Sequence, residues 1–263
     1  MQLTSERFFL WFNKLVFSLL YLRQQGKSEA VIEVCGGVRF KVRVNTADIL
    51  MIWEIWRAKV YDDVRIPIGE GDIVVDMGAH IGAFAVRAAR LAHHGQVYAY
   101  EASAKNYALL TENRQLNGLK NLHIENCAVS DRCGVMPLYT PAGNSILGSL
   151  LQETSSFKEM VQAKTFSAII AEHALEQIDF LKVDVEGSEF DILFDCSDET
   201  LAKIRHLVIE YHDFVGYKRS HLDLVNLLNL HGFRVVVEKG IFPQPNWFGT
   251  HITKIGIIKA WRV

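Results

Sequence analysis

A short apolar run, a glycine-bearing turn and a helical segment follow one another in the first half of the chain. The run Asp72–Asp76 has the composition of a buried strand, and Ala83–Ala92 has the composition and period of a helix. Between them, Gly78 and Gly82 would let a ligand approach the backbone, and the helix start would offer free N–H groups. This order is typical of a ligand-binding βα unit.

A carboxylate follows the next predicted strand. The strand Gln96–Tyr100 ends in Glu101, where an acidic side chain can accept hydrogen bonds from both ribose hydroxyls of a nucleoside. The helix Ser103–Asn117, with Ser103 as its N-cap, and the strand Asn121–Glu125 come next. The sequence therefore predicts a β-α-β-α-β half-domain that binds a nucleoside.

The charge of Asp76 favours one class of nucleoside over another. It ends the first strand, and the turn after it reads Asp-x-Gly-Ala-x-x-Gly, whereas dinucleotide folds usually show Gly-x-Gly-x-x-Gly. A carboxylate at this place would repel a pyrophosphate but suits a cationic ligand with an amino group. We therefore predict the methyl donor S-adenosylmethionine as the cofactor. A structural or helix-capping role for Asp76 stays open, and so does an NAD-dependent oxidoreductase of related topology.

The second half of the chain continues the alternation of strands and helices, and two further strands end in the polar residues Asp184 and His212. In an open α/β sheet, ligands bind at the carboxyl ends of the strands. We therefore expect these two residues, Asp76 and Glu101 to line one site. The predicted strands of this half are Val135–Tyr139, Ile178–Asp184, Ile204–Tyr211, Phe233–Val237 and Ile252–Ala260, and the helices are Phe166–Ala174, a segment ending near Phe194, and Ser220–His231.

Five motifs resemble those of the FkbM-type S-adenosylmethionine-dependent methyltransferases. The resemblance covers about residues 50 to 260, and its most specific part is the Lys-x-Asp-x-Glu-Gly-x-Glu pattern that begins at Lys182. It implies an α/β, Rossmann-like class I methyltransferase sheet of seven mostly parallel strands, with helices on both faces and the last strand antiparallel. The motifs are Val74–Phe84, Tyr100–Ser103, Asn126–Asp131, Leu181–Leu193 and Val208–His212.

The same resemblance implies methyl transfer to a hydroxyl oxygen, typically on a sugar, a glycan or a natural product. Position by position, it implies that the turn from Asp76 to Gly82 lines the amino-acid end of the cofactor and that Glu101 holds the ribose. It also implies that Asn126–Val129 border the adenine and that Asp184 lies at the methyl-bearing end. The predicted cofactor-binding residues are Asp76, Gly78, Ala79, Gly82, Phe84, Glu101, Ala102, Asn126, Cys127, Ala128, Val129 and Asp184.

The predicted catalytic residues are Asp184, Glu186 and His212. A sugar hydroxyl is a poor nucleophile, so a base within hydrogen-bond reach helps, and an imidazole with an ordinary pKa of about 6.5 suits that task. His212 is therefore the predicted base, unless it only fixes a neighbouring loop. Glu186 follows a strand and begins a helix, so stabilisation of the helix N-terminus is its simpler interpretation.

A divalent cation held by Asp184 and neighbouring carboxylates would be another way to acidify the hydroxyl. The sequence shows no fixed ligand spacing for such an ion and no zinc spacing among its cysteines and histidines, so we predict no metal. His80 lies inside the predicted cofactor turn, where its side chain could contact the ligand or face away.

Residues 1–70 are predicted to form an N-terminal cap, and residues 71–263 the cofactor-binding domain. Ala30–Cys35 and Val38–Val44 flank Gly36-Gly37, which predicts a hairpin with a two-residue turn, one apolar face and one basic face. Asp48–Tyr61 is predicted to be a helix that joins this hairpin to the rest of the chain.

The segment Phe8–Leu22 is strongly apolar but is interrupted by Asn13 and Lys14. A spanning helix needs about 20 apolar residues, so this segment is short for that role. A helix packed on the catalytic domain or on another subunit, an interfacial helix on a membrane, and a signal anchor stay open. We expect a cytoplasmic protein in which residues 8–22 support homo-oligomer or peripheral membrane contact.

Composition excludes several other classes. The hydrophobic fraction of 49% is too high for a disordered chain. With 28 basic against 30 acidic side chains, the chain also lacks the excess of positive charge that binding to nucleic-acid phosphates requires. We therefore expect a small-molecule or glycan acceptor and no nucleic acid. Thr140–Ser149 is predicted to be a loop over the acceptor site or a surface insertion. A non-catalytic, cofactor-binding interaction module is the remaining alternative.

Overall fold

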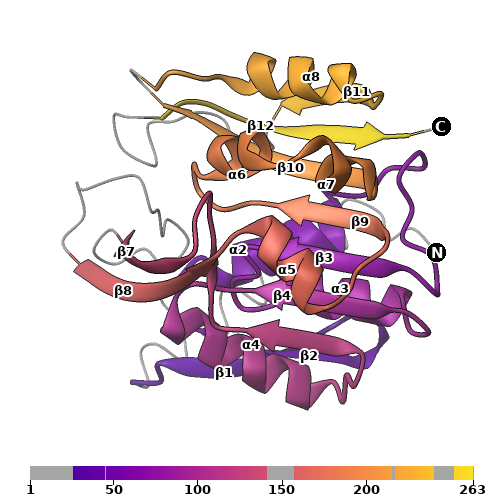
Figure 1. Ribbon diagram of the computed structural model, residues 1–263. Helices are drawn as coiled ribbons and strands as arrows, with labels where there is room; N and C mark the ends of the chain where they lie inside the picture. Colours follow the sequence, from indigo (N-terminus) through magenta and orange to yellow (C-terminus); the bar gives the residue numbers. More distant parts are fainter. Residues whose placement is uncertain (1–25, 45, 141–156, 215–216, 240–251, 263) are drawn as a thin grey trace.

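The centre of the computed structural model is a seven-stranded sheet with the order β11-β12-β10-β9-β3-β4-β5 (Figure 1). The structure describes residues 26–44, 46–140, 157–214, 217–239 and 252–262. Neighbouring strands from β10 to β5 run parallel, and β12 is antiparallel to β10 and β11, as the resemblance implies. The strands are β3 (Ile73–Met77), β4 (Gln96–Tyr100), β5 (Leu122–Glu125), β9 (Ile178–Val183), β10 (Ile204–Phe214), β11 (Arg234–Lys239) and β12 (Ile252–Trp261).

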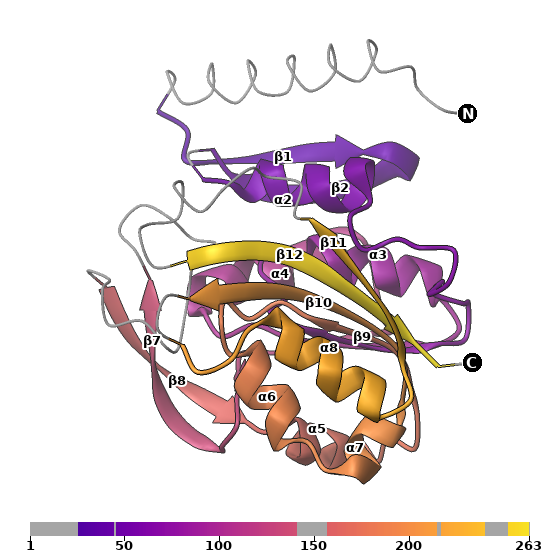
Figure 2. The ribbon, with the colours of Figure 1, turned by 90° about the horizontal axis from the view of Figure 1, so that it is seen from above.

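Each face of the sheet carries its own apolar cluster, because successive side chains of a strand point to opposite faces. On β3, Val74 belongs to the cluster under α3 and α4, while Val75 and Met77 belong to the cluster on the other face. Figure 2 shows the two helical layers on either side of the sheet. They consist of α3 (Ala83–Leu91) and α4 (Ala104–Leu116) on one face, and α5 (Phe166–Glu172), α6 (Glu189–Asp195), α7 (Asp198–Ala202) and α8 (His221–Leu230) on the other. The predicted α/β fold is therefore confirmed.

The N-terminal segment forms a cap, which lies over α3 and α4 as a further layer (Figure 2). Val38, Phe40 and Val42 alternate with basic residues and are fully buried in the same apolar cluster as α3 and α4. The cap therefore continues the core on this face. Its elements are β1 (Glu29–Val34), η1 (Cys35–Gly37), β2 (Val38–Arg43), α2 (Asp48–Trp53) and the π-helical turn η2 (Glu54–Ala58).

Two details of the cap differ from the sequence prediction. The predicted two-residue turn was wrong: Val34 pairs with Val38, so Cys35–Gly37 form a three-residue loop in which Gly36 and Gly37 have φ of 77° and 72°. The predicted helix Asp48–Tyr61 changes to π geometry at Glu54 and ends at Lys59, which is left-handed with φ of 56°.

A small second sheet follows β5 and has the order β6-β8-β7. The sequence predicted one of its strands and missed the other two, of which β6 has only two residues and β8 does not alternate regularly. The strands are β6 (Ala128–Val129), β7 (Gly134–Thr140) and β8 (Phe157–Lys164). Past Thr140, the predicted loop Thr140–Ser149 lies outside the described residues, as does the segment Phe8–Leu22.

The strand β10 extends beyond its predicted end. It runs to Phe214 because β12 pairs along it, with His212 opposite Ile255 and Phe214 opposite Ile252. The prediction that His212 follows the end of this strand was therefore wrong, and His212 is an internal strand residue. Among the described residues, no helix is long and apolar enough to cross a membrane.

Candidate functional site

Polar side chains interrupt the apolar cap-side face of the sheet on three adjacent strands. Asp76, Lys182 and Glu210 each lie two residues after a core residue of this face, on β3, β9 and β10. Because parallel strands end at the same edge, these side chains meet at the carboxyl edge of the sheet, where α/β folds bind ligands. Asp184 follows β9 at the same edge, so the structure brings together most of the predicted strand-end residues.

The predicted cofactor turn needs its glycines. Gly78 and Gly82 have φ of 81° and 90°, and a Cβ on Gly78 would lie 1.7 Å from the backbone O of Asp184. A Cβ on Gly82 would lie 2.5 Å from the Cδ1 of Leu110. No side chain fits at Gly78 unless the backbone moves. The amides of Gly78 and Ala79 donate to the carbonyl of Tyr100 at 3.0 and 2.9 Å, which ties the turn to the end of β4.

Glu101, the predicted ribose ligand, lies just past β4 and is 7% exposed. Its Oε2 accepts from the backbone N of His80 at 2.8 Å, and its Oε1 accepts from the N of Ser103 at 2.9 Å and from the Nδ2 of Asn106 at 3.3 Å. Burial raises the pKa of Glu101, and these three hydrogen bonds oppose the rise. A carboxylate has about four lone-pair directions, and the described residues use three of those of Glu101, with one donor on Oε2.

Asp76 forms a buried ion pair that the sequence reasoning missed. Its Oδ1 lies 3.0 Å from the Nζ of Lys182, which also donates to the carbonyl of Gly78 at 2.9 Å. Burial disfavours the charged lysine, but Asp76 and Asp184 outweigh it and raise the pKa of Lys182. Asp76 therefore does not present an isolated negative charge, as the sequence argument assumed. Its buried Oδ2 has no hydrogen-bond partner within the described residues.

Beside Asp184, Tyr61 from the cap joins two carboxylates. Its hydroxyl lies 3.2 Å from the Oδ2 of Asp184 and 2.7 Å from the Oε2 of Glu210. A hydroxyl has one hydrogen, so the two carboxylates share one donor. Burial, and then Asp184, raise the pKa of Glu210 to about 7. Sequence reasoning missed Tyr61 and Glu210, although a glutamate inside a buried strand was itself a signal.

His212 lies between two glutamates. Its Nδ1 is 2.6 Å from the Oε1 of Glu189 and its Nε2 is 3.3 Å from the Oε2 of Glu186, and the ring is 3% exposed. Burial opposes charge on the ring, but Glu186 and Glu189 outweigh it and raise the pKa of His212 above its usual value. Burial also raises the pKa of Glu186 to about 8. The two glutamates therefore favour the protonated form of the imidazole, which is poorly suited to accept a proton alone.

The π-helical turn adds a carboxyl from the cap. Burial, and then the charges of Glu210, Asp184 and Glu186, raise the pKa of Glu54 to about 9. Glu54 is the first residue of η2, and π-turns are often found at functional sites. Sequence reasoning missed this residue, because the change to π geometry is not visible in the hydrophobic pattern.

The residues predicted to border the adenine lie beside the end of β4. Asn126 donates from Nδ2 to the carbonyls of Glu101 and Ala102 at 2.8 and 2.9 Å. The neighbouring side chains Cys127, Ala128 and Val129 are all buried within apolar clusters. Their contact with adenine stays a prediction, and it would use mainly the backbone of this segment.

The structure also shows which residues surround Phe84, a predicted cofactor ligand, and His80, whose orientation the sequence left open. Phe84 is buried between the rings of Tyr61 and Phe180, with centroids 5.8 and 5.7 Å away, and its contact with the cofactor stays a prediction. His80 faces the cap, because its Nε2 lies 3.4 Å from the Nη2 of Arg43 and 3.6 Å from the Oδ1 of Asp48.

Two groups among the described residues have ligand atoms close enough to share a metal ion. In the buried group, one ligand atom from each of Asp184, Glu210 and His212 lies within 4.8 Å of the others. The second group is exposed and consists of Glu70, His93 and His94. The absence of a metal stays a prediction, and Asp184 with Glu210 and His212 is the place where the metal alternative would apply.

Comparison with known proteins points to one family. A sequence profile described as the methyltransferase FkbM domain matches residues 76–235. The chain is 28% identical to 31-O-demethyl-FK506 methyltransferase FkbM of Streptomyces tacrolimicus, over 81% of this chain and 90% of that protein. It is 30% identical to methyltransferase sdnD of Sordaria araneosa, over 60% and 72% respectively. It is 26% identical to 2-O-methyltransferase NoeI of Sinorhizobium fredii, over 58% and 70%.

Proposed function

This chain belongs to the FkbM methyltransferase family, and on that basis we propose that it transfers a methyl group from S-adenosylmethionine to a hydroxyl oxygen of a sugar, glycan or natural product. The names of two relatives, a 31-O-demethyl-FK506 methyltransferase and a 2-O-methyltransferase, support oxygen as the acceptor atom. The observation that carries the proposal is the juxtaposition, at one sheet edge, of a glycine turn beside Glu101 and a buried carboxylate–histidine cluster.

The residues at the cofactor turn fit this cofactor. The lack of a side chain at Gly78 lets the turn pack directly against the backbone of Asp184, which brings the turn and Asp184 together at one place. The buried Oδ2 of Asp76 is an acceptor without a partner in the described residues and would take the cofactor ammonium. Glu101 would hold the ribose through Oε2, and the backbone after Asn126 would border the adenine.

S-adenosylmethionine supplies a methyl group that is already activated on a sulfonium. The protein must then align the acceptor oxygen with that methyl group and take up the hydroxyl proton. Glu186 is 14% exposed, whereas His212 behind it is 3% exposed, so Glu186 is the member of the pair that can meet the acceptor. Glu186 would take up the proton that the acceptor hydroxyl loses as its oxygen is methylated.

His212 and Asp184 have supporting roles in this proposal. The protonated imidazole of His212, held by Glu189, orients Glu186 and stabilises its carboxylate before the proton arrives. Asp184 lies beside Lys182 and Tyr61, where its charge would favour the sulfonium end of the cofactor. This arrangement keeps the predicted catalytic residues but moves the proton-accepting role from His212 to Glu186.

The test is product identification. The protein is incubated with methyl-labelled S-adenosylmethionine and fractionated glycans and metabolites, and the labelled product is identified by mass spectrometry and NMR. We expect a methyl ether, and no labelled product with a Glu101→Ala variant that no longer binds the cofactor. Label on nitrogen or carbon would refute the oxygen assignment, and failure of the wild-type protein to bind S-adenosylmethionine would refute the cofactor.

A further inference from the structure

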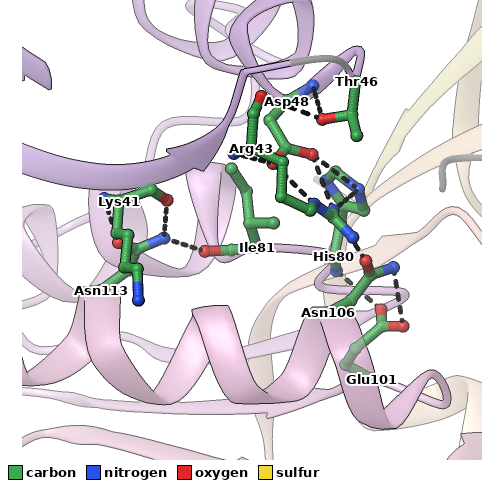
Figure 3. Close-up of polar contacts among 9 residues, drawn as sticks. All are labelled: Lys41, Arg43, Thr46, Asp48, His80, Ile81, Glu101, Asn106 and Asn113. Atoms are coloured by element: carbon green, nitrogen blue, oxygen red, sulfur yellow. Dashed lines mark hydrogen bonds and ion pairs between the residues drawn. The ribbon is translucent and has the colours of Figure 1, made fainter. Parts of the chain in front are cut away.

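One side chain of the N-terminal hairpin reaches the ribose carboxylate through a single intermediary (Figure 3). We propose that Arg43 is a positioning residue for the cofactor, and that it acts through Asn106 to set the geometry with which Glu101 holds the ribose. This inference rests on the proposed cofactor and goes beyond it, because it makes the cap part of the cofactor site.

The first step is that Arg43 is itself fixed. Asp48 is fully buried, and its Oδ2 accepts from the backbone N and the Nε of Arg43, both at 2.9 Å. Its Oδ1 accepts from the Nη2 of Arg43 at 2.7 Å. Such a two-point pairing of guanidinium with carboxylate fixes the plane of the guanidinium as well as its position. Burial opposes ionisation of Asp48, but the hydrogen bonds and charge of Arg43 outweigh it and lower the pKa of Asp48.

The second step is that Arg43 decides which way the amide of Asn106 points. The Nη2 of Arg43 lies 2.9 Å from the Oδ1 of Asn106, and a guanidinium can only donate. The amide oxygen therefore faces Arg43, and the NH₂ group faces the Oε1 of Glu101 at 3.3 Å. Without Arg43, the amide oxygen would lose this donor, and the NH₂ group would be held toward Glu101 less firmly.

The third step is the contact of Arg43 with the cofactor turn. Its Nη2 lies 3.4 Å from the Nε2 of His80, and burial lowers the pKa of His80 to about 4, so the ring is neutral. The backbone N of His80, a left-handed residue with φ of 52°, donates to Glu101. Arg43 therefore contacts two of the residues that donate hydrogen bonds to Glu101.

The chain provides a matched control in Arg39, four residues earlier on the same side of β2. Its Nη2 donates to the carbonyl of Leu116 at 3.1 Å, and its backbone N donates to the Oδ1 of Asn117 at 3.0 Å. Like the contacts of Arg43, these contacts hold the hairpin against α4. They lie at the C-terminal end of α4, whereas Asn106 and Glu101 lie at its N-terminal end. Loss of Arg39 should therefore weaken docking without changing the ribose site.

The test measures affinity for S-adenosylhomocysteine and for its analogue without ribose hydroxyls, by calorimetry on the full chain. Wild type should bind S-adenosylhomocysteine more tightly than the analogue without ribose hydroxyls. Arg43→Ala should lose roughly 5- to 100-fold in affinity for S-adenosylhomocysteine, within the range of typical coupling between sites. It should also lose most of the preference for the ligand with ribose hydroxyls. Arg39→Ala should keep both. Asn106→Ala leaves the Arg43–Asp48 pair in place and should reproduce the loss, and the double variant should be no worse than either single variant.

Three outcomes would overturn the inference: an Arg43→Ala protein that retains the preference for ribose hydroxyls, an Asn106→Ala protein that does so, or effects of the two changes that multiply. If Arg43→Ala does not fold, Asn106→Ala decides alone by the same ribose comparison. Failure of wild type to bind either ligand would instead refute the proposed function, so the two failures are distinguishable.

Discussion

The Nζ of Lys182 lies 3.0 Å from the Oδ1 of Asp76, and both side chains are buried on the cap-side face of the sheet. The pair joins β3 to β9 directly beneath the cofactor turn, because Lys182 also donates to the carbonyl of Gly78. Asp184 lies 3.5 Å from the same Nζ, so a single lysine balances two carboxylates. A buried charge that loses its partner is not compensated by water.

We therefore expect Lys182→Met to cost about 3–5 kcal/mol in the free energy of unfolding, the usual range for a broken buried pair. Asp76 would be left without a counter-charge and the carbonyl of Gly78 without its donor, so affinity for S-adenosylmethionine should fall as well. Urea unfolding and calorimetry check the two effects. Lys203→Met, which removes a half-buried lysine whose Nζ donates to the carbonyl of Leu175, is the control. Equal stability of the two variants would show that the pair is not needed.

Gly78→Ala should disrupt the cofactor turn. The new Cβ would lie 1.7 Å from the carbonyl O of Asp184, and the left-handed φ of 81° adds strain. Gly118→Ala is the control, since Gly118 has φ of 61° but nothing within 4 Å of its Cβ. We expect the control to lose about 1–2 kcal/mol in the free energy of unfolding, from backbone strain alone. Gly78→Ala should cost about 1–3 kcal/mol more because of overpacking. Similar unfolding midpoints in urea would contradict the steric argument.

The sheet and the cofactor turn were predictable because both depend on local pattern. The run Asp72–Asp76 and the helix after it show their periods in sequence, and the glycines mark the turn between them. The pairing of Asp76 with Lys182 was not predictable in the same way, because it depends on β3 lying next to β9, a contact between residues 106 positions apart.

The acceptor side was harder to predict for a related reason. Tyr61 reaches Glu210 across 149 positions of sequence, and only the position of the cap over the sheet brings them together. Glu54 enters the site through a π-turn that no periodicity reveals. His212 was found, but its two glutamate contacts depend on how α6 packs beside β10, so sequence alone suggested a free base.

Stability should fall as pH rises through the neutral range. The pKa values of Glu210, Glu186 and Glu54 are raised to about 7, 8 and 9, whereas an unfolded glutamate titrates near 4.5. Between these limits the folded state binds more protons than the unfolded state, so the free energy of unfolding decreases with rising pH. The raised pKa of His212 also makes the free energy of unfolding decrease as pH rises. Urea midpoints measured from pH 5 to 9.5 check this trend.

Glu54→Gln should flatten the upper part of that pH dependence, because an amide cannot ionise beside the other carboxylates. At pH 9.5 this variant should be more stable relative to wild type than it is at pH 5. Glu33→Gln, which changes an exposed residue of β1, should follow the wild-type curve. A Glu54→Gln curve parallel to that of wild type would show that this carboxyl does not interact with the cluster.

Glu186→Gln tests the proton-accepting step. Turnover of wild type should rise with pH toward about 8, where Glu186 loses its proton. The variant should lose about 10²- to 10⁴-fold in kcat, the usual contribution of a general base, and should lose the rise with pH. Its affinity for S-adenosylmethionine should stay near wild type. Glu199→Gln on α7, an exposed change, is the control. Normal turnover in Glu186→Gln would return the role to His212 or to a metal-bound route.

Removal of divalent ions separates those two routes. Since we predict no metal, EDTA treatment followed by gel filtration should leave turnover unchanged, and added Mg²⁺ or Mn²⁺ should not raise it. If EDTA instead lowered turnover and either ion restored it, the prediction would be wrong. A cation on Asp184, Glu210 and His212 would then act by lowering the pKa of the bound acceptor hydroxyl. Glu210→Gln should then lose the response, whereas His93→Ala with His94→Ala should keep it, because that exposed group lies elsewhere. Metal retained by the wild type but lost from the His93/His94 variant would identify surface binding, which has no part in the reaction.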